Sequence, residues 1–236
     1  MTLFVPVEEQ TIQMCGYATE NRAVPAGPRL IATDLACRRG SRVLFRGLAL
    51  DVGPQHIVWV RGQNGRGKTS LLRLAAGLAA PEAGQLLCDG VPVRRADASR
   101  WLFIGHGNAL KEDLTAREAL QFLLRVQARP CDAASADAAL DRLGLASRRH
   151  AMVRTLSQGQ RRRVALSRLA VDVTMAAPSL WLLDEPFDAL DADAMQRLNV
   201  LVADHLRRGG SVLLSSHLPL DPSLGAIEVN LDAYPP

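Results

Sequence analysis

The glycine-rich segment from Gly62 to Thr69 constrains the fold of this chain more than any other feature. It matches the pattern G-x-x-x-x-G-K-[ST], and it lies between an apolar, strand-like run at 56–60 and a helix-forming run that begins at Lys68. Glycines let successive backbone N–H groups turn toward a phosphate, and the helix adds the positive end of its dipole. The strand–loop–helix context predicts a nucleotide-binding P-loop rather than a structural glycine turn.

Every residue of this loop is a candidate ATP ligand. The side chain of Lys68 is expected to reach the β- and γ-phosphates, and the hydroxyl of Thr69 is expected to hold Mg²⁺. The other predicted ATP-binding positions are Gly62, Gln63, Asn64, Gly65, Arg66, Gly67 and Ser70. ATP and Mg²⁺ are therefore the predicted cofactors.

The composition is typical of a soluble globular protein with one substantial core. The chain has 236 residues, of which 48% are hydrophobic and 22% are charged. No uncharged apolar run is long enough to span a bilayer, and residues 1–15 carry no basic region of the kind found in a secretory signal. We predict a cytoplasmic location, with docking to another subunit as the route to a membrane. The four cysteines form no C-x-x-C pair, so metal or redox chemistry is not expected.

The formal net charge of +4 raises the question of nucleic-acid binding. Lysine occurs only at Lys68 and Lys111, so 26 of the 28 basic residues are arginine, and alanine is abundant too. This excess of arginine and alanine is typical of compositional bias in the genome and does not by itself indicate a binding surface. Because the charges are scattered, apart from short clusters at 38–39, 148–149 and 161–163, they favour a solvated surface, and no nucleic-acid partner is predicted.

The order of segments predicts one α/β domain over residues 30–236. Residues 30–60 are strand-like, about 109–173 carry a helical period, and strands resume at 180–183. We therefore expect a helical insert between two sheet segments. Residues 1–29 lack periodicity and are expected to form a poorly ordered extension, or in part a misassigned start.

Two acidic residues follow the apolar run at 180–183. If this run is a central parallel strand, Asp184 and Glu185 lie at its carboxyl end. Asp184 would then face Mg²⁺, directly or through water, and Glu185 could align or deprotonate an attacking water. An ordinary acidic turn is the alternative, and the P-loop makes it the weaker one.

The segment 156–160 reads L-S-Q-G-Q and immediately precedes a helix-forming run. It resembles the L-S-G-G-Q signature of ATP-binding cassette (ABC) proteins. The order of P-loop, helical insert, signature, acidic strand and His217 also resembles that family, over about residues 30–218. The resemblance implies an α/β P-loop NTPase, specifically an ABC nucleotide-binding domain, with an antiparallel β subdomain and a helical signature subdomain.

The resemblance also implies roles in a head-to-tail homodimer that encloses two ATP molecules. The signature residues of one copy, Ser157, Gln158, Gly159 and Gln160, would contact the ATP of the other. The Ser157 hydroxyl and the Gly159 N–H would bind its γ-phosphate, as suits a helix N-terminus. The loop 187–191 would connect the two sites, and His217 would contact the γ-phosphate as a catalytic partner of Glu185.

Three positions depart from the family pattern. Gln158 replaces the first glycine of the signature, which makes the loop less permissive there. The family's lid glutamine, which should follow the strand-like run 101–104, is missing. Either His106 or Asn108 takes its place, or neither residue does. The adenine-stacking aromatic is also missing. Arg38 is the candidate replacement, since a guanidinium can stack on a purine.

These departures, together with the stretch 180–191, resemble the ATP-binding subunit of the haem exporter of cytochrome c maturation. That family implies an ATP hydrolase coupled to transport, peripheral on the cytoplasmic face of the bacterial inner membrane. It also implies a multi-spanning permease and other cytochrome c maturation subunits as partners. The alternatives are a cassette for another substrate, such as a lipid or a drug, and a soluble cassette acting on nucleic acid or the ribosome. A small-molecule kinase is disfavoured by the signature.

Overall fold

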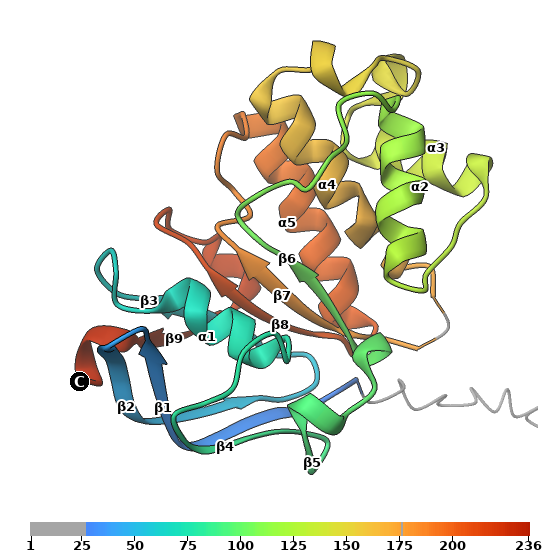
Figure 1. Ribbon diagram of the computed structural model, residues 1–236. Coiled ribbons are helices and arrows are strands. Elements are labelled where there is room, and N and C mark those ends of the chain that lie inside the picture. The colour runs from blue at the N-terminus through green and yellow to red at the C-terminus, as the bar shows by residue number, and fades with distance from the viewer. Residues whose placement is uncertain (1–26, 176) are drawn as a thin grey trace, which may run out of the picture.

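Two β-sheets organise the chain in the computed structural model, which describes residues 27–175 and 177–236 (Figure 1). The parallel sheet has the strand order β6-β7-β8-β3-β9, formed by β3 (Ile57–Arg61), β6 (Trp101–Ile104), β7 (Leu180–Asp184), β8 (Ser211–Ser215) and β9 (Ile227–Asn230). The antiparallel sheet has the order β2-β1-β4-β5, formed by β1 (Leu30–Arg39), β2 (Arg42–Val52), β4 (Ala83–Cys88) and β5 (Val91–Pro92).

Five α-helices are described, and they divide between the two faces of the parallel sheet (Figure 1). They are α1 (Lys68–Ala75), α2 (Ala116–Val126), α3 (Ala133–Arg142), α4 (Gln158–Asp172) and α5 (Ala192–Arg207). Six short 3₁₀ helices connect the elements: η1 (Val93–Arg95), η2 (Ala98–Arg100), η3 (Ala146–Arg148), η4 (Val153–Thr155), η5 (Pro222–Leu224) and η6 (Leu231–Ala233). Helices α2, α3 and α4 form the helical region that lies farthest from the antiparallel sheet in Figure 1.

The parallel sheet is covered on both faces, and strand β7 shows how. All five of its residues are buried. Leu180 and Leu182 pack into the core shared with α1 and the antiparallel sheet, whereas Trp181 and Leu183 pack into the core shared with α2 to α5. This alternation is the expected result of a two-residue side-chain period in a strand buried on both sides.

Local sequence signals predict helix starts at Thr115 and Ser157 and a hairpin turn at Asp89-Gly90, and all three are present. Thr115 and Ser157 each form a complete capping box, with Glu118 and Gln160 respectively. The turn at Asp89-Gly90 joins β4 to β5, and both residues have positive φ, 50° and 78°. Local chemistry therefore determined these boundaries.

Within residues 42–52 the apolar pattern of the sequence predicts two short strands, 43–45 and 48–52, and this prediction is wrong. The structure has a single strand, β2, that passes through an irregularity in its pairing with β1. Gly47 lies there with a φ of 68°. A bulge of this kind interrupts the alternation of side chains, so the sequence pattern is broken although the strand continues.

The predicted fold class, an α/β P-loop NTPase with an antiparallel β subdomain and a helical signature subdomain, is confirmed. Most of the extension expected at 1–29 lies outside the described residues, while Gly27 already bonds the core, donating its N–H to the carbonyl oxygen of Gly209 over 3.0 Å. None of the helices in 27–175 or 177–236 combines the length and apolarity needed to cross a bilayer.

Candidate nucleotide-binding and hydrolysis site

The P-loop connects β3 to α1 and requires glycine at several points. Gly62, Gly65 and Gly67 have φ values of 140°, 81° and 107°, which side-chain-bearing residues rarely adopt. A Cβ on Gly67 would also come within 3.2 Å of Leu44 and Phe45. The loop therefore keeps a curved backbone in front of the N-terminus of α1, which is a favourable place for an anion.

The charge of Lys68 lies inside this curve. Its Nζ donates to the carbonyl oxygen of Gly62 over 2.8 Å, and the residue is only 8% exposed. A buried ammonium beside a helix N-terminus is a strong site for a polyanion.

Asp184 lies directly beside the start of α1. Its Oδ1 accepts a hydrogen bond from Thr69 Oγ1 at 3.2 Å and one from Ser215 Oγ at 2.8 Å. The carboxylate is 1% exposed, and its Oδ2 has no hydrogen-bond partner among the described residues. A buried carboxylate oxygen next to a hydroxyl is a suitable donor pair for a hard cation such as Mg²⁺, which usually takes one or two protein ligands and completes its shell with phosphate and water.

Glu185 and His217 form a second pair at the same edge of the sheet. The backbone N–H of His217 donates to Glu185 Oε2 over 2.9 Å, and His217 Nε2 lies 3.2 Å from Glu185 Oε1. Glu185 has a φ of 47°, and its own N–H donates to the Oγ of Ser215. Strands β7 and β8 thus place a carboxylate and an imidazole where parallel strands end.

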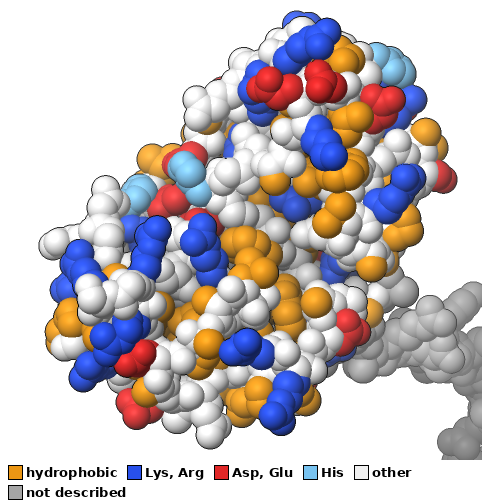
Figure 2. Space-filling view, viewed as in Figure 1, with side chains coloured by type: hydrophobic (Ala, Val, Ile, Leu, Met, Phe, Trp, Pro, Cys, Tyr) orange, Lys and Arg blue, Asp and Glu red, His pale blue; other side chains and the backbone are white. Residues whose placement is uncertain are grey.

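A pocket of about 290 Å³ collects most of the predicted groups. Its lining residues come from the P-loop, from β1 and β2, and from the ends of the parallel strands: Arg39, Leu44, Asn64, Gly65, Gly67, Lys68, Thr69, Ser70, His106, Glu185, Asp188 and His217. Figure 2 shows histidine, acidic and basic side chains gathered where the β-rich half meets the helical half. Gln63 and Arg66 do not line this pocket, and the backbone N–H of Gln63 and the Nε of Arg66 donate to Asp232.

Arg38 is not part of the pocket, contrary to the prediction. Its guanidinium pairs with Glu82 at 2.7 Å, whereas Arg39 lines the pocket. Side chains alternate along β1, and Cys37 contacts Ser70 on the P-loop side. The same face therefore receives Arg39, two residues on, and Arg38 points the other way.

The signature residues are at the N-terminus of α4, and the same chain's pocket does not include them. A Cβ on Gly159 would lie 2.5 Å from the carbonyl oxygen of Ala189, so this position must be glycine. Gln158 is exposed in the first turn with an ordinary φ, which explains why the missing glycine is tolerated. The signature thus packs against the loop 187–191 through Gly159.

The structure distinguishes the two lid candidates. The His106 side chain is 72% exposed, lines the pocket and has its Nδ1 3.8 Å from Asp188 Oδ2. Asn108 instead accepts a hydrogen bond from Arg162 through its Oδ1. Of the two, only His106 faces the nucleotide loop.

Asp232 is a functional candidate that the sequence pattern missed. It lies in η6 near the C-terminus and accepts the N–H of Gln63 and the Nε of Arg66, the latter at 2.9 Å. The hydrogen bond from Arg66 lowers the pKa of Asp232. Nothing local marks this aspartate, because its partners are more than 160 residues away in the chain.

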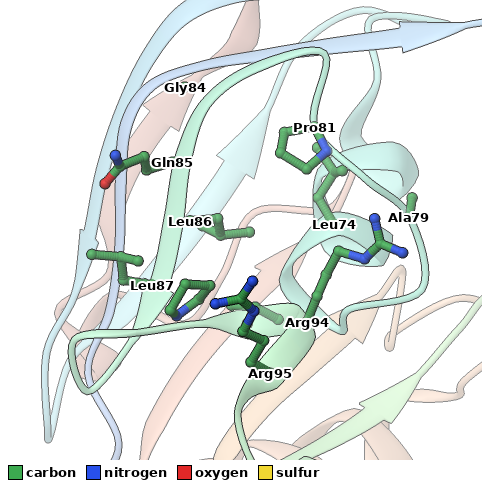
Figure 3. A pocket seen from close by; sticks show the side chains of 11 residues that line it. Leu74, Ala79, Pro81, Gly84, Gln85, Leu86, Leu87, Arg94 and Arg95 are labelled. Atoms are coloured by element: carbon green, nitrogen blue, oxygen red, sulfur yellow. The ribbon is translucent and has the colours of Figure 1, made fainter.

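A larger cavity, of about 660 Å³, lies away from the P-loop (Figure 3). Leu74 from α1 and Leu86 and Leu87 from β4 form its apolar wall, and the side chains of Arg94 and Arg95 lie beside it. It contains no acidic or nucleophilic group, so its size does not make it a reaction site.

The strand–loop–helix phosphate site, with a buried acid pair and a histidine at the ends of neighbouring parallel strands, defines a P-loop ATPase. A family model described as "ABC transporter" matches residues 45–188, more than half of the chain. The chain belongs to the ATP-binding cassette family of transport ATPases, and members of that family bind nucleotide.

Within the family the chain is similar to the cytochrome c biogenesis ATP-binding export proteins CcmA. It is 45% identical to the protein of Aromatoleum aromaticum over 82% of this chain and 91% of that one. It is 44% identical to the protein of Pseudomonas putida KT2440 over 87% and 97%. The predicted resemblance is thus confirmed, and the chain is a CcmA-like ABC ATPase.

Solved structures support the same fold at lower identity. A putative ABC transporter ATP-binding protein of Pyrococcus furiosus superposes with a TM-score of 0.75 at 22% identity, over 88% of this chain and all of that one. The dimeric post-hydrolysis state of an ATP-binding cassette bound to ADP and Pi superposes with a TM-score of 0.67 at 21% identity, over 85% and 94%.

Proposed function

We propose that the chain is the ATP-hydrolysing subunit of a membrane exporter that handles haem for cytochrome c biogenesis. The observation that carries the chemistry is that Thr69, Glu185 and His217 line one pocket beside Lys68, with Asp184 hydrogen-bonded to Thr69. The assignment to cytochrome c biogenesis rests on the 45% identity to export proteins of that name.

The phosphate chain of ATP would be held by the P-loop N–H groups and by Lys68. Thr69 and Asp184 would hold Mg²⁺, whose charge would offset that of the phosphates. Glu185 would orient the attacking water and take its proton, because its carboxylate is 8% exposed and is aimed by His217. His217 would also donate from its ring toward the γ-phosphate.

Arg39, rather than Arg38, is proposed to stack on the adenine ring. Arg39 lines the pocket together with Leu44 and the P-loop residues. An arginine plane can stack on an adenine ring, so Arg39 would supply the contact that an aromatic residue would otherwise make.

Two copies are proposed to close head to tail over two ATP molecules. Ser157 to Gln160 form a helix N-terminus that points out of the same chain's pocket, and this supports binding to a second chain's phosphate. The similar cassette bound to ADP and Pi is dimeric, which supports the same arrangement.

The proposed site of action is the cytoplasmic face of the bacterial inner membrane, by docking to a multi-spanning permease and further maturation subunits. The relatives are named export proteins, while the described helices offer no membrane span. Hydrophobic side chains also gather in the hollow between the β-rich and helical halves in Figure 2, on a face that a partner could cover.

The chemistry is tested with Glu185→Gln. The purified variant is expected to bind ATP as the wild type does, to release phosphate at least about 100-fold more slowly, and to elute as an ATP-dependent dimer. Glu228→Gln, the same substitution at an exposed position of β9 that does not line the pocket, is the control and keeps most of the turnover. Normal phosphate release by Glu185→Gln would remove Glu185 from its proposed role.

The biological assignment is tested in cells that lack the chain. Such cells are expected to lose covalently bound haem in c-type cytochromes, and the wild-type chain but not Glu185→Gln restores it. Affinity purification from membranes should recover a multi-spanning permease. Normal c-type cytochromes together with a lipid or drug phenotype would favour another exporter, and ATPase activity stimulated by nucleic acid would favour a soluble cassette.

A further inference from the structure

Arg162 is a buried cation in the second turn of α4 that the proposed chemistry does not use. It is 3% exposed, and burial lowers the pKa of its guanidinium. No carboxylate in the described parts of the chain forms an ion pair with it. A buried charge without a direct ion pair is costly, so its hydrogen bonds must account for much of its stability.

Those hydrogen bonds go to the backbone of the two catalytic acids. Arg162 Nη2 donates to the carbonyl oxygens of Asp184 and Glu185, each over 2.8 Å. Glu185 has a φ of 47°, a conformation that is strained for a non-glycine residue. The guanidinium therefore stabilises the strained turn that directs one carboxylate at Thr69 and the other at His217.

The other terminal nitrogen of the guanidinium bonds the segment 105–108, which contains the two lid candidates. Arg162 Nη1 donates to the carbonyl oxygen of Gly105 over 2.9 Å and to that of His106 over 3.4 Å, and it also contacts Asn108 Oδ1 at 3.3 Å. These contacts occupy Asn108 and fix the backbone from which His106 reaches the pocket. One planar group thus joins the lid to the acids.

The helix that carries Arg162 begins at the signature. Ser157 caps α4, and Gly159 packs tightly on the loop that follows Glu185. Because an α-helix is stiff over two turns, a shift of its N-terminus is passed to Arg162 and so to the carbonyls that it holds.

We propose that Arg162 is a positioning residue that couples the signature helix to the acids and lid of its own chain's site. Binding of the second copy's ATP at Ser157 then sets the alignment of Glu185, and the two sites of the dimer act together. This inference rests on the proposed function, since it needs the closed dimer.

The test compares Arg162→Gln and Arg162→Lys with Arg163→Gln. Arg163 is the next residue of the same helix and makes none of these hydrogen bonds. For both Arg162 variants, the ATP affinity of the monomer should stay within about twofold of wild type, while kcat should fall roughly 100-fold, as a misplaced catalytic group predicts. The Hill coefficient for ATP should fall to one.

Lysine should rescue little, because an ammonium keeps the charge but lacks the fork that bridges two pairs of carbonyls. Rescue of kcat and of cooperativity by Arg162→Lys would overturn the proposal, as would wild-type turnover in Arg162→Gln. Thermal unfolding of each variant checks that the fold is intact. If Arg162→Gln does not fold, kcat and the Hill coefficient are measured for Arg162→Lys and Asn108→Ala instead. Asn108→Ala removes only one of the acceptors of Arg162.

The wild type separates this inference from the proposed function. The proposed function itself would be contradicted if the wild-type chain did not hydrolyse ATP and the Glu185→Gln variant did not dimerise with ATP. Intact wild-type hydrolysis and dimerisation, with unchanged kcat and cooperativity in the Arg162 variants, would contradict the coupling alone.

Discussion

At the scale of single residues, chemically identical side chains have different environments in this chain. Lys68 is buried against the carbonyl oxygen of Gly62, whereas Lys111 is exposed and lies over the ring of Phe122, with 4.5 Å between its Nζ and the ring centroid. Since these are the chain's two lysines, each provides the control for the other.

Lys68→Ala is expected to weaken ATP binding roughly tenfold to 100-fold, because the phosphates lose a charge-assisted hydrogen bond. Lys111→Ala should leave ATP affinity unchanged, since its ammonium lies away from the pocket. Titration with a fluorescent ATP analogue measures both. Equal affinities for the two variants would contradict the phosphate-binding role of Lys68.

Arg38 and Arg39 form a second matched pair. Arg39→Ala should weaken ATP binding roughly threefold to thirtyfold, the range expected from loss of a stacked guanidinium, and Arg38→Ala should not. Competition by inorganic tripolyphosphate, which lacks adenine, should be the same in both variants. Weaker tripolyphosphate competition in Arg39→Ala would show that Arg39 binds phosphate rather than the base.

At the scale of elements, α4 and α5 end at one buried polar cluster under the parallel sheet. Asp172 of α4 accepts from Trp181 Nε1 at 2.7 Å and from Ser179 Oγ at 2.6 Å, and it pairs with Arg129. His205 of α5 stacks on Trp181 with ring centroids 3.8 Å apart. The cluster joins the helical region to the sheet at the edge opposite the nucleotide pocket.

This cluster predicts a pH dependence of stability. Burial lowers the pKa of His205 from 6.5 to about 4. The unfolded chain therefore binds the proton first as pH falls, and the stabilisation present above pH 6.5 is lost between about 6.5 and 4. The loss would amount to about 3 kcal/mol.

Urea unfolding at a series of pH values in that window measures the effect. His205→Asn should show a flatter decline than wild type, while His150→Gln, which changes an exposed histidine, should show the wild-type decline. A wild-type slope in His205→Asn would assign the acid sensitivity to other groups.

At the scale of the whole molecule, the signature of one chain is proposed to complete the site of another. Ser157→Asp keeps a good N-cap for α4 but places a carboxylate where the second copy's γ-phosphate would bind. Monomer ATP affinity should be unchanged, whereas dimerisation in the Glu185→Gln background should be lost. Ser157→Thr, which keeps cap and hydroxyl, should still dimerise. Size-exclusion chromatography with ATP distinguishes these outcomes.

The sequence alone determined what depends on neighbouring residues. The P-loop glycines, the capping boxes at Thr115 and Ser157 and the buried strand 180–184 are local patterns, so their elements could be predicted. The order of these motifs was enough to predict the family.

Only the tertiary structure decided what depends on distant segments. The choice of Arg39 over Arg38 follows from the face of β1 that meets the P-loop, and the choice of His106 over Asn108 follows from the hydrogen bond that Arg162 makes to Asn108. Asp232 reaches the P-loop from the last helical turn of the chain, and Arg162 reaches the carbonyls of Asp184 and Glu185 from another helix. Such contacts bring together residues far apart in the chain, and hydrogen bonds that form only after the sheet is assembled leave no periodic signal in the sequence.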